Sequence, residues 1–101
     1  MNTPQSLRQS INFQVGSIVS QELLNKSSGT ITLFAFDKGQ SLSEHTAPYD
    51  ALVQVIEGAA KVTISGVVNV VNVDESILMP ANAPHALTAI EPFKMILTMI
   101  K

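Results

Sequence analysis

His45 and His85 are the two histidines of this chain, and they are the side chains best suited to chemistry near neutral pH. A pair of imidazoles can work as a general acid and base, so both residues are candidate catalytic groups. Imidazole nitrogen is also a ligand for divalent Fe, Mn, Ni or Zn. The chain has no cysteine, which excludes disulfides and thiolate metal sites within it and is compatible with a reducing compartment.

The elements that position these histidines are expected to be β-strands. Apolar residues alternate with polar ones through most of the chain, as in residues 30–33 and 61–65. The last segment places alternate apolar side chains on one face, namely Phe93, Met95, Leu97 and Met99. Residues 18–24 are the one ambiguous stretch, and they favour a strand over a helix.

Turn signals separate these segments at short intervals. They lie at residues 27–29, 37–39, 65–66, 72–75 and 80–84. The pair Ser65-Gly66 predicts a two-residue hairpin turn in which Gly66 has a positive φ. Strands at this spacing predict an all-β sandwich or barrel. A length of 101 residues fits a single domain over residues 1–101, with residues 1–10 as a loose N-terminal segment.

Composition excludes some partners and favours others. Charged residues make up 14% of the chain, against ~25% in typical domains, so we expect part of the surface to be covered in a homodimer. The six cationic residues are scattered, which argues against nucleic acid as a partner. Neither a signal peptide nor a membrane-spanning run is recognisable, so we expect a cytoplasmic protein that does not bind membranes.

Two stretches resemble the paired motifs of the cupin family. The first family motif is a glycine, five residues, His-x-His, three or four residues, Glu, six residues and a glycine. Gly39, His45 and Gly58 match it, whereas Ala47 and Ala51 stand where the second histidine and the glutamate belong. The second motif, Pro-x-Gly-x-x-His, is similar to residues 80–85.

The second motif departs from the family pattern at several positions. Asn82 replaces its glycine, and this change is mild because asparagine tolerates the left-handed backbone region. Asp74 replaces the glycine that leads the motif, and Ala89 its trailing asparagine. The resemblance implies a cupin-type double-stranded β-helix, a jelly-roll-like barrel of two antiparallel sheets that is commonly dimeric, with a pocket between the two motifs.

The family's metal site, as the resemblance implies it, consists of three histidines and one glutamate. In this chain His45 and His85 match that set, and Ala47 and Ala51 have no donor atoms. Glu44 and Asp50 have the wrong strand parity to substitute, whereas Tyr49 and Ser43 have the right parity but are weak ligands. A divalent Fe, Mn, Ni or Zn ion at His45 and His85 is therefore a hypothesis with an incomplete ligand set.

The two alanines enlarge the predicted pocket and make it more apolar, which favours a small, partly apolar ligand. Its expected lining is His45, Ala47, Tyr49, Ala51, Met79 and His85. Met79, Met95 and Met99 also fit ordinary core filling, and His85 alone fits a hydrogen-bonded core residue.

Three functions stay open from the sequence. The first is a small-molecule-binding cupin barrel, and the second is a metal-dependent dioxygenase or isomerase with an incomplete two-histidine site. The third is a metal-free enzyme that uses the two histidines for proton transfer. The cupin fold supports many functions, so the family resemblance does not choose between them.

Overall fold

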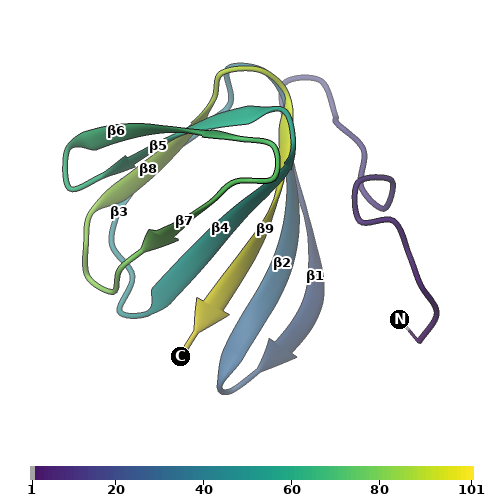
Figure 1. Cartoon of the computed structure of the whole chain (residues 1–101), viewed down its shortest axis with the longest axis horizontal. Coiled ribbons are helices and arrows are strands. Elements are labelled where there is room, and N and C mark those ends of the chain that lie inside the picture. The colour runs from purple at the N-terminus through teal and green to yellow at the C-terminus, as the bar shows by residue number, and fades with distance from the viewer. Residues whose placement is uncertain (1) are drawn as a thin grey trace.

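Nine antiparallel β-strands form the regular structure of residues 2–101, the part of the chain that the computed structural model describes (Figure 1). The strands are β1 (Ile18–Lys26), β2 (Gly29–Phe36), β3 (Ser41–His45), β4 (Asp50–Glu57), β5 (Ala59–Ile64), β6 (Val67–Asn72), β7 (Ser76–Met79), β8 (His85–Ala89) and β9 (Phe93–Ile100). Across residues 2–101 there is no helix that could cross a membrane.

The strands form two sheets that pack face to face. One sheet has five strands in the order β1-β2-β9-β4-β7, and the other has four in the order β3-β8-β5-β6. Figure 1 shows the four-stranded sheet at the left and most of the five-stranded sheet at the right. Most consecutive strands lie in opposite sheets, as β3 and β4 do, which is the arrangement of a double-stranded β-helix. The predicted all-β jelly-roll-like barrel is confirmed.

Alternate residues of both sheets meet in one core, as the period-two pattern predicts. Phe36 and Phe93 are fully buried there, and their rings stack with centroids 4.5 Å apart. Phe34 lies on the same face as Phe36, with ring centroids 6.0 Å apart, and it packs against the edge of the core. Both phenylalanines of β2 therefore serve packing between the sheets.

The turns use backbone conformations that the sequence indicates. Gly66 has a φ of 81°, as predicted, and Ser65 before it also has a positive φ of 49°. A two-residue turn with both central residues at positive φ matches the twist of the strands that it joins. Asn82 and Asp74, which replace motif glycines, likewise have positive φ values of 66° and 69°.

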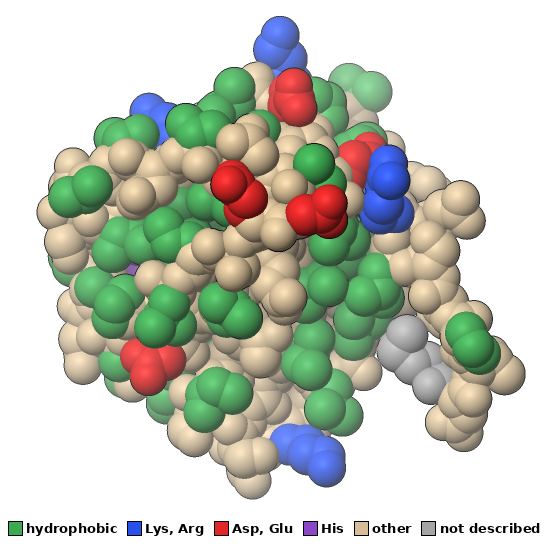
Figure 2. Space-filling model, in the orientation of Figure 1, with side chains coloured by type: hydrophobic (Ala, Val, Ile, Leu, Met, Phe, Trp, Pro, Cys, Tyr) green, Lys and Arg blue, Asp and Glu red, His purple; other side chains and the backbone are tan. Residues whose placement is uncertain are grey.

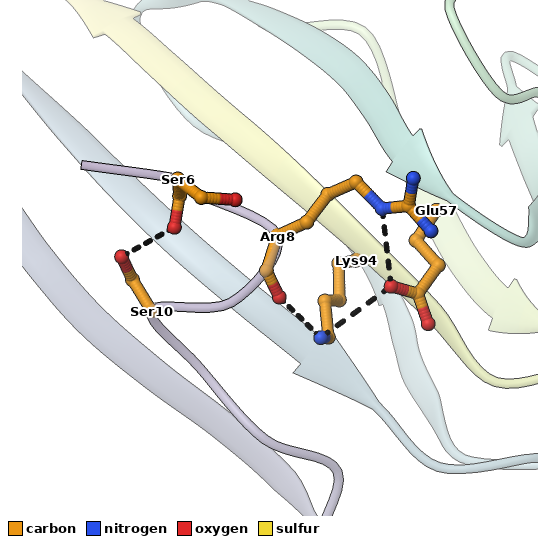
Figure 3. A network of polar contacts seen from close by, with 5 residues as sticks. All are labelled: Ser6, Arg8, Ser10, Glu57 and Lys94. Atoms are coloured by element: carbon orange, nitrogen blue, oxygen red, sulfur yellow. Dashed lines mark hydrogen bonds and ion pairs between the residues drawn. The ribbon is translucent and has the colours of Figure 1, made fainter. Parts of the chain in front are cut away.

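The N-terminal segment, expected to be loose, lies against the outer face of the five-stranded sheet. Lys94 is only 7% exposed there, and its Nζ donates a hydrogen bond to the Arg8 carbonyl (Figure 3). The same Nζ lies 3.4 Å from Glu57 Oε1 and 5.0 Å from the centroid of the Phe13 ring. A buried ammonium needs such partners, so Lys94 attaches this segment to the barrel.

Apolar contacts reinforce that attachment. Ile11 is buried with Leu33 and Ala35 of β2 in a small apolar cluster separate from the main core. Leu7 and Phe13 pack against this outer cluster. The outward-facing side of the five-stranded sheet is thus partly covered by the chain's own N-terminal residues.

Candidate functional site

His45 and His85 are direct partners on neighbouring antiparallel strands, β3 and β8. Their Nε2 atoms lie 3.0 Å apart, and the two rings meet edge to face at an interplanar angle of 72°. His85 is 5% exposed, whereas His45 is exposed. The structure therefore brings the two predicted site residues together, one inside the barrel and one at its mouth.

The other ring nitrogen of each histidine is held by the backbone. Nδ1 of His45 lies 2.7 Å from the Ser43 carbonyl oxygen, and Nδ1 of His85 lies 3.0 Å from the Ala83 carbonyl oxygen. A carbonyl oxygen only accepts hydrogen bonds, so both Nδ1 atoms carry the hydrogen. With both rings neutral, both Nε2 atoms then carry lone pairs, whereas one proton on either Nε2 makes their 3.0 Å contact a hydrogen bond. The pair is therefore arranged to share a proton or to hold another electron-poor group.

A cavity of about 60 Å³ lies between the two sheets beside this pair. Its lining consists of Leu42, His45, Ala47, Ala51, Met79, His85, Leu87, Met95, Leu97 and Met99. The two imidazoles are the polar side chains in this lining, and every other member is apolar. Figure 2 shows histidine atoms between hydrophobic side chains on the left of the face in view.

The cavity is small although alanines occupy two of the family's ligand positions. Ala51 is buried, and its register partners on the adjacent strands are Met79 and Met99. These flexible side chains line the space around Ala51. A volume of about 60 Å³ suits a few atoms, compared with ~300–1,000 Å³ for pockets that bind larger organic ligands.

Two hydrogen bonds fix the loops at the mouth of the cavity. The Asn82 amide donates to the Ala47 carbonyl oxygen at 2.7 Å, and the Ala81 amide donates to Asp50 Oδ1 at 2.8 Å. The β3–β4 and β7–β8 loops are thereby joined to each other. Asp50 is engaged in this contact and does not line the cavity, and Glu44 is exposed, as strand parity predicts for both.

A register irregularity in β3 changes which side chains face the cavity. It falls between Leu42 and His45, and both of these residues line the cavity although they are three positions apart. In a regular strand such residues would face opposite sides. Ser43, which strand parity places beside His45, is instead exposed and contributes its carbonyl oxygen.

Tyr49 lies outside the cavity lining. It precedes β4, is 36% exposed, and its ring centroid lies 5.9 Å from Lys101 Nζ. The loop position leaves its ring at the surface.

Comparison with known proteins agrees with this geometry. The family model described as "Cupin domain" matches residues 32–100, which include both histidines and most of the strands. This chain belongs to the cupin family. A search of curated proteins found no match.

Two similar solved structures come from Streptococcus pyogenes and Leptotrichia buccalis. A conserved protein of unknown function from Streptococcus pyogenes is 35% identical, with 100% of this cupin and 89% of that chain covered and a TM-score of 0.96. A cupin 2 conserved barrel domain protein from Leptotrichia buccalis is 41% identical over 93% of this chain, with a TM-score of 0.90. The match covers 46% of the Leptotrichia chain, so this cupin spans about half its length.

A third similar structure is that of a cupin superfamily protein from Desulfitobacterium hafniense. It is 25% identical, with 99% of this chain and 92% of that chain covered and a TM-score of 0.94. These similarities support the cupin fold and assign no ligand to it.

The donor set of this cupin does not fit the divalent metal that the family resemblance implies. Among residues 2–101 no group of three or more His, Cys, Asp or Glu side chains lies close enough to hold an ion. Ala47 and Ala51 occupy the remaining ligand positions without donor atoms, and their neighbours in the lining are apolar. Divalent Fe, Mn, Ni or Zn usually has three or four such protein ligands, so two imidazoles form only part of a site.

Sequence reasoning missed several residues that line the cavity. Leu42, Leu87 and Leu97 are absent from the predicted lining. Met95 and Met99 are absent from it too, because they also fit ordinary core filling. Strand alternation would have indicated Leu87, two residues after His85, and Leu97, two before Met99. Leu42 had no such signal because the irregularity in β3 reverses its parity.

Proposed function

We propose that this cupin is a small-molecule-binding protein that holds its guest in the cavity beside His45 and His85. The observation that carries this proposal is the 3.0 Å approach of the two Nε2 atoms, with both Nδ1 hydrogens directed to backbone carbonyls. Two lone pairs so close together are favourable only when a proton or another electron-poor group lies against them. A hydroxyl, an ammonium group or a cation meets that requirement.

The lining limits the size and character of the guest. The cavity holds only a few atoms, and apart from the imidazoles its walls are apolar. Because His45 is exposed, a guest could extend past it towards solvent. Methionine side chains adapt their shape readily, so a short apolar group can displace them and enlarge the space. We therefore propose a short apolar molecule that carries one hydrogen-bond donor.

A fragment screen by NMR tests this function. The library pairs small alcohols and amines with ethers of matched size that lack the donor hydrogen. We expect the donor-bearing members to shift the Nε2 resonances of His45 and His85 preferentially, because only they complete the two-nitrogen site. The ¹⁵N spectra should also show the hydrogen on Nδ1 of both rings.

The control for this screen is His45→Leu, which removes one Nε2 atom from an exposed position and should leave the fold intact. Binding of the donor-bearing fragments should weaken by about 10-fold or more, as expected when one hydrogen bond to a polar site is lost together with the pairing of its neighbour. Equal binding of alcohols and ethers, or fragments that shift neither histidine, would refute the proposal.

We further propose that the protein forms a homodimer. An open groove of about 460 Å³ beside the N-terminal segment has no charged side chain in its lining, which is Leu7, Leu23, Leu24, Ile31, Gln54, Ile96 and Thr98. It adjoins β1, an edge strand of the five-stranded sheet, where Leu24 is 46% exposed. A long edge strand beside an apolar surface favours pairing with a second copy.

Light scattering during size exclusion measures this assembly. We expect twice the 10.8 kDa mass of one chain, and a monomer for Leu24→Glu because the substitution places a charge in the groove. Val67→Glu, at an exposed position on the four-stranded sheet, should leave the dimer unchanged. A monomeric parent protein would contradict the proposal.

A further inference from the structure

Two methionines flank the position that lacks a carboxylate. Met79 on β7 and Met99 on β9 are both register partners of Ala51 on β4, so the three residues form one row across the five-stranded sheet. All three line the cavity that His45 and His85 line from the four-stranded sheet. The cavity therefore has two imidazoles on one wall and two thioethers on the other.

These four side chains lie at the same end of the barrel. One loop joins His45 at the end of β3 to β4, where Ala51 is the second residue, and another joins Met79 at the end of β7 to His85 at the start of β8. The two loops are hydrogen-bonded to each other. Met95 is four residues from Met99 along β9, about 13 Å at the usual rise per residue, and it pairs with Val55 instead.

The possible metal ligands at this end of the barrel are neutral, and the two thioether sulfurs are soft. The lining contains no carboxylate and no thiol. The solvation energy of an ion grows with the square of its charge. A divalent ion therefore loses about four times as much solvation energy as a monovalent ion on entering apolar surroundings. Neutral donor atoms offset a smaller share of the larger loss. Thioether sulfur selects Cu(I) among the first-row metals, and imidazole also suits copper.

The imidazole geometry is compatible with a shared ion. With metal–nitrogen distances of about 2.0–2.1 Å, two Nε2 atoms 3.0 Å apart subtend an angle of about 95° at the metal. Each Nδ1 hydrogen is bound to a backbone carbonyl, which is the outer contact that orients metal-binding histidines.

We propose that the same cavity also binds Cu(I), through Nε2 of His45 and His85 and the sulfur atoms of Met79 and Met99. This inference rests on the proposed function of the cavity and adds a second class of guest, a soft monovalent cation that takes the place of the organic donor group. It gives the two methionines beside Ala51 a binding role in addition to core filling.

The test uses untagged protein and Cu(I) supplied without oxygen in competition with a colorimetric Cu(I) chelator. We expect one equivalent of Cu(I) per chain, and X-ray absorption of the unmodified protein should show both nitrogen and sulfur neighbours around copper. Zn²⁺ should not displace it. Because the absorption measurement needs no substitution, it stands even if a variant folds poorly.

Matched variants separate ligands from packing residues. Met79→Leu and Met99→Leu keep side-chain volume, and each should weaken Cu(I) binding at least as much as loss of an outer contact to a ligand, about 10- to 100-fold. Met95→Leu removes the third thioether of the lining and should weaken Cu(I) binding less than either of these variants, and Ile56→Leu, outside the lining, should bind Cu(I) like the parent. A metal spectrum without sulfur, or a Met79→Leu/Met99→Leu double variant that binds like the parent, would overturn the assignment.

The outcomes also distinguish this inference from the proposed function. Donor-bearing fragments that bind the metal-free protein while Cu(I) does not would overturn the copper assignment alone. Failure of both the fragments and Cu(I) to bind would overturn the guest site itself.

Discussion

Gly58→Ala is expected to destabilise the protein by about 3 kcal/mol or more, because the new methyl group has no free space. A Cβ at this position would lie 2.1 Å from the Pro92 carbonyl oxygen and 2.9 Å from the Phe93 Cα. Both atoms belong to the backbone, so a side-chain rotation cannot relieve the overlap. Gly58 also has a φ of 75°, which costs a residue with a Cβ about 1–2 kcal/mol, and overpacking adds roughly 1–3 kcal/mol.

Gly39→Ala is the matched control for this substitution. Gly39 has a similar φ of 79°, but a Cβ there would have nothing within 4 Å. Its substitution should therefore cost only the backbone term of about 1–2 kcal/mol. Chemical denaturation of both variants measures the difference. Equal losses of stability would show that the approach of Pro92 and Phe93 has no energetic role.

Phe36→Ala is the second substitution with a large expected effect. Phe36 is fully buried, and its ring stacks on Phe93 at a centroid distance of 4.5 Å. Removal of a buried ring leaves a cavity that rigid neighbours fill only in part, and such changes cost about 3–5 kcal/mol. Domains of this size have a total stability of about 5–15 kcal/mol, so the variant should lose a large share of its free energy of unfolding.

The neighbouring Phe34 provides the comparison for Phe36. Phe34 lies on the same face of β2 but is only partly buried, so Phe34→Ala should cost less in the same denaturant titration. Phe36→Leu should recover much of the loss because it fills most of the space. A Phe36→Ala protein as stable as Phe34→Ala would contradict the core described above.

The local sequence was sufficient to predict the strands and most of the turns. Period-two alternation located β5 and β9, and the ambiguous residues 18–24 are indeed within a strand. The spacing of Gly39, His45, Gly58 and His85 led to the cupin resemblance, which the family match and the fold confirm. These features depend on neighbours within a few residues, which the chain specifies directly.

Other features depended on contacts between distant segments. The irregularity in β3 placed Leu42 in the cavity, and the methionines on β7 and β9 reduced the space beside Ala51. The attachment of the N-terminal segment required Lys94, whose position so close to Arg8 has no signal in the local sequence. Periodicity gives the face on which a side chain lies but not how far the opposite sheet's side chains reach.

The sequence by itself determined the all-β architecture, the two motif histidines and the glycines at the turns, because these follow from local backbone preferences and strand periodicity. Only the tertiary structure decided that the two Nε2 atoms meet at 3.0 Å with both Nδ1 hydrogens engaged, and that thioethers flank the vacant carboxylate position. The physical reason is that the site is formed where two sheets pack, so its volume and its donor set depend on side chains from strands far apart in the chain.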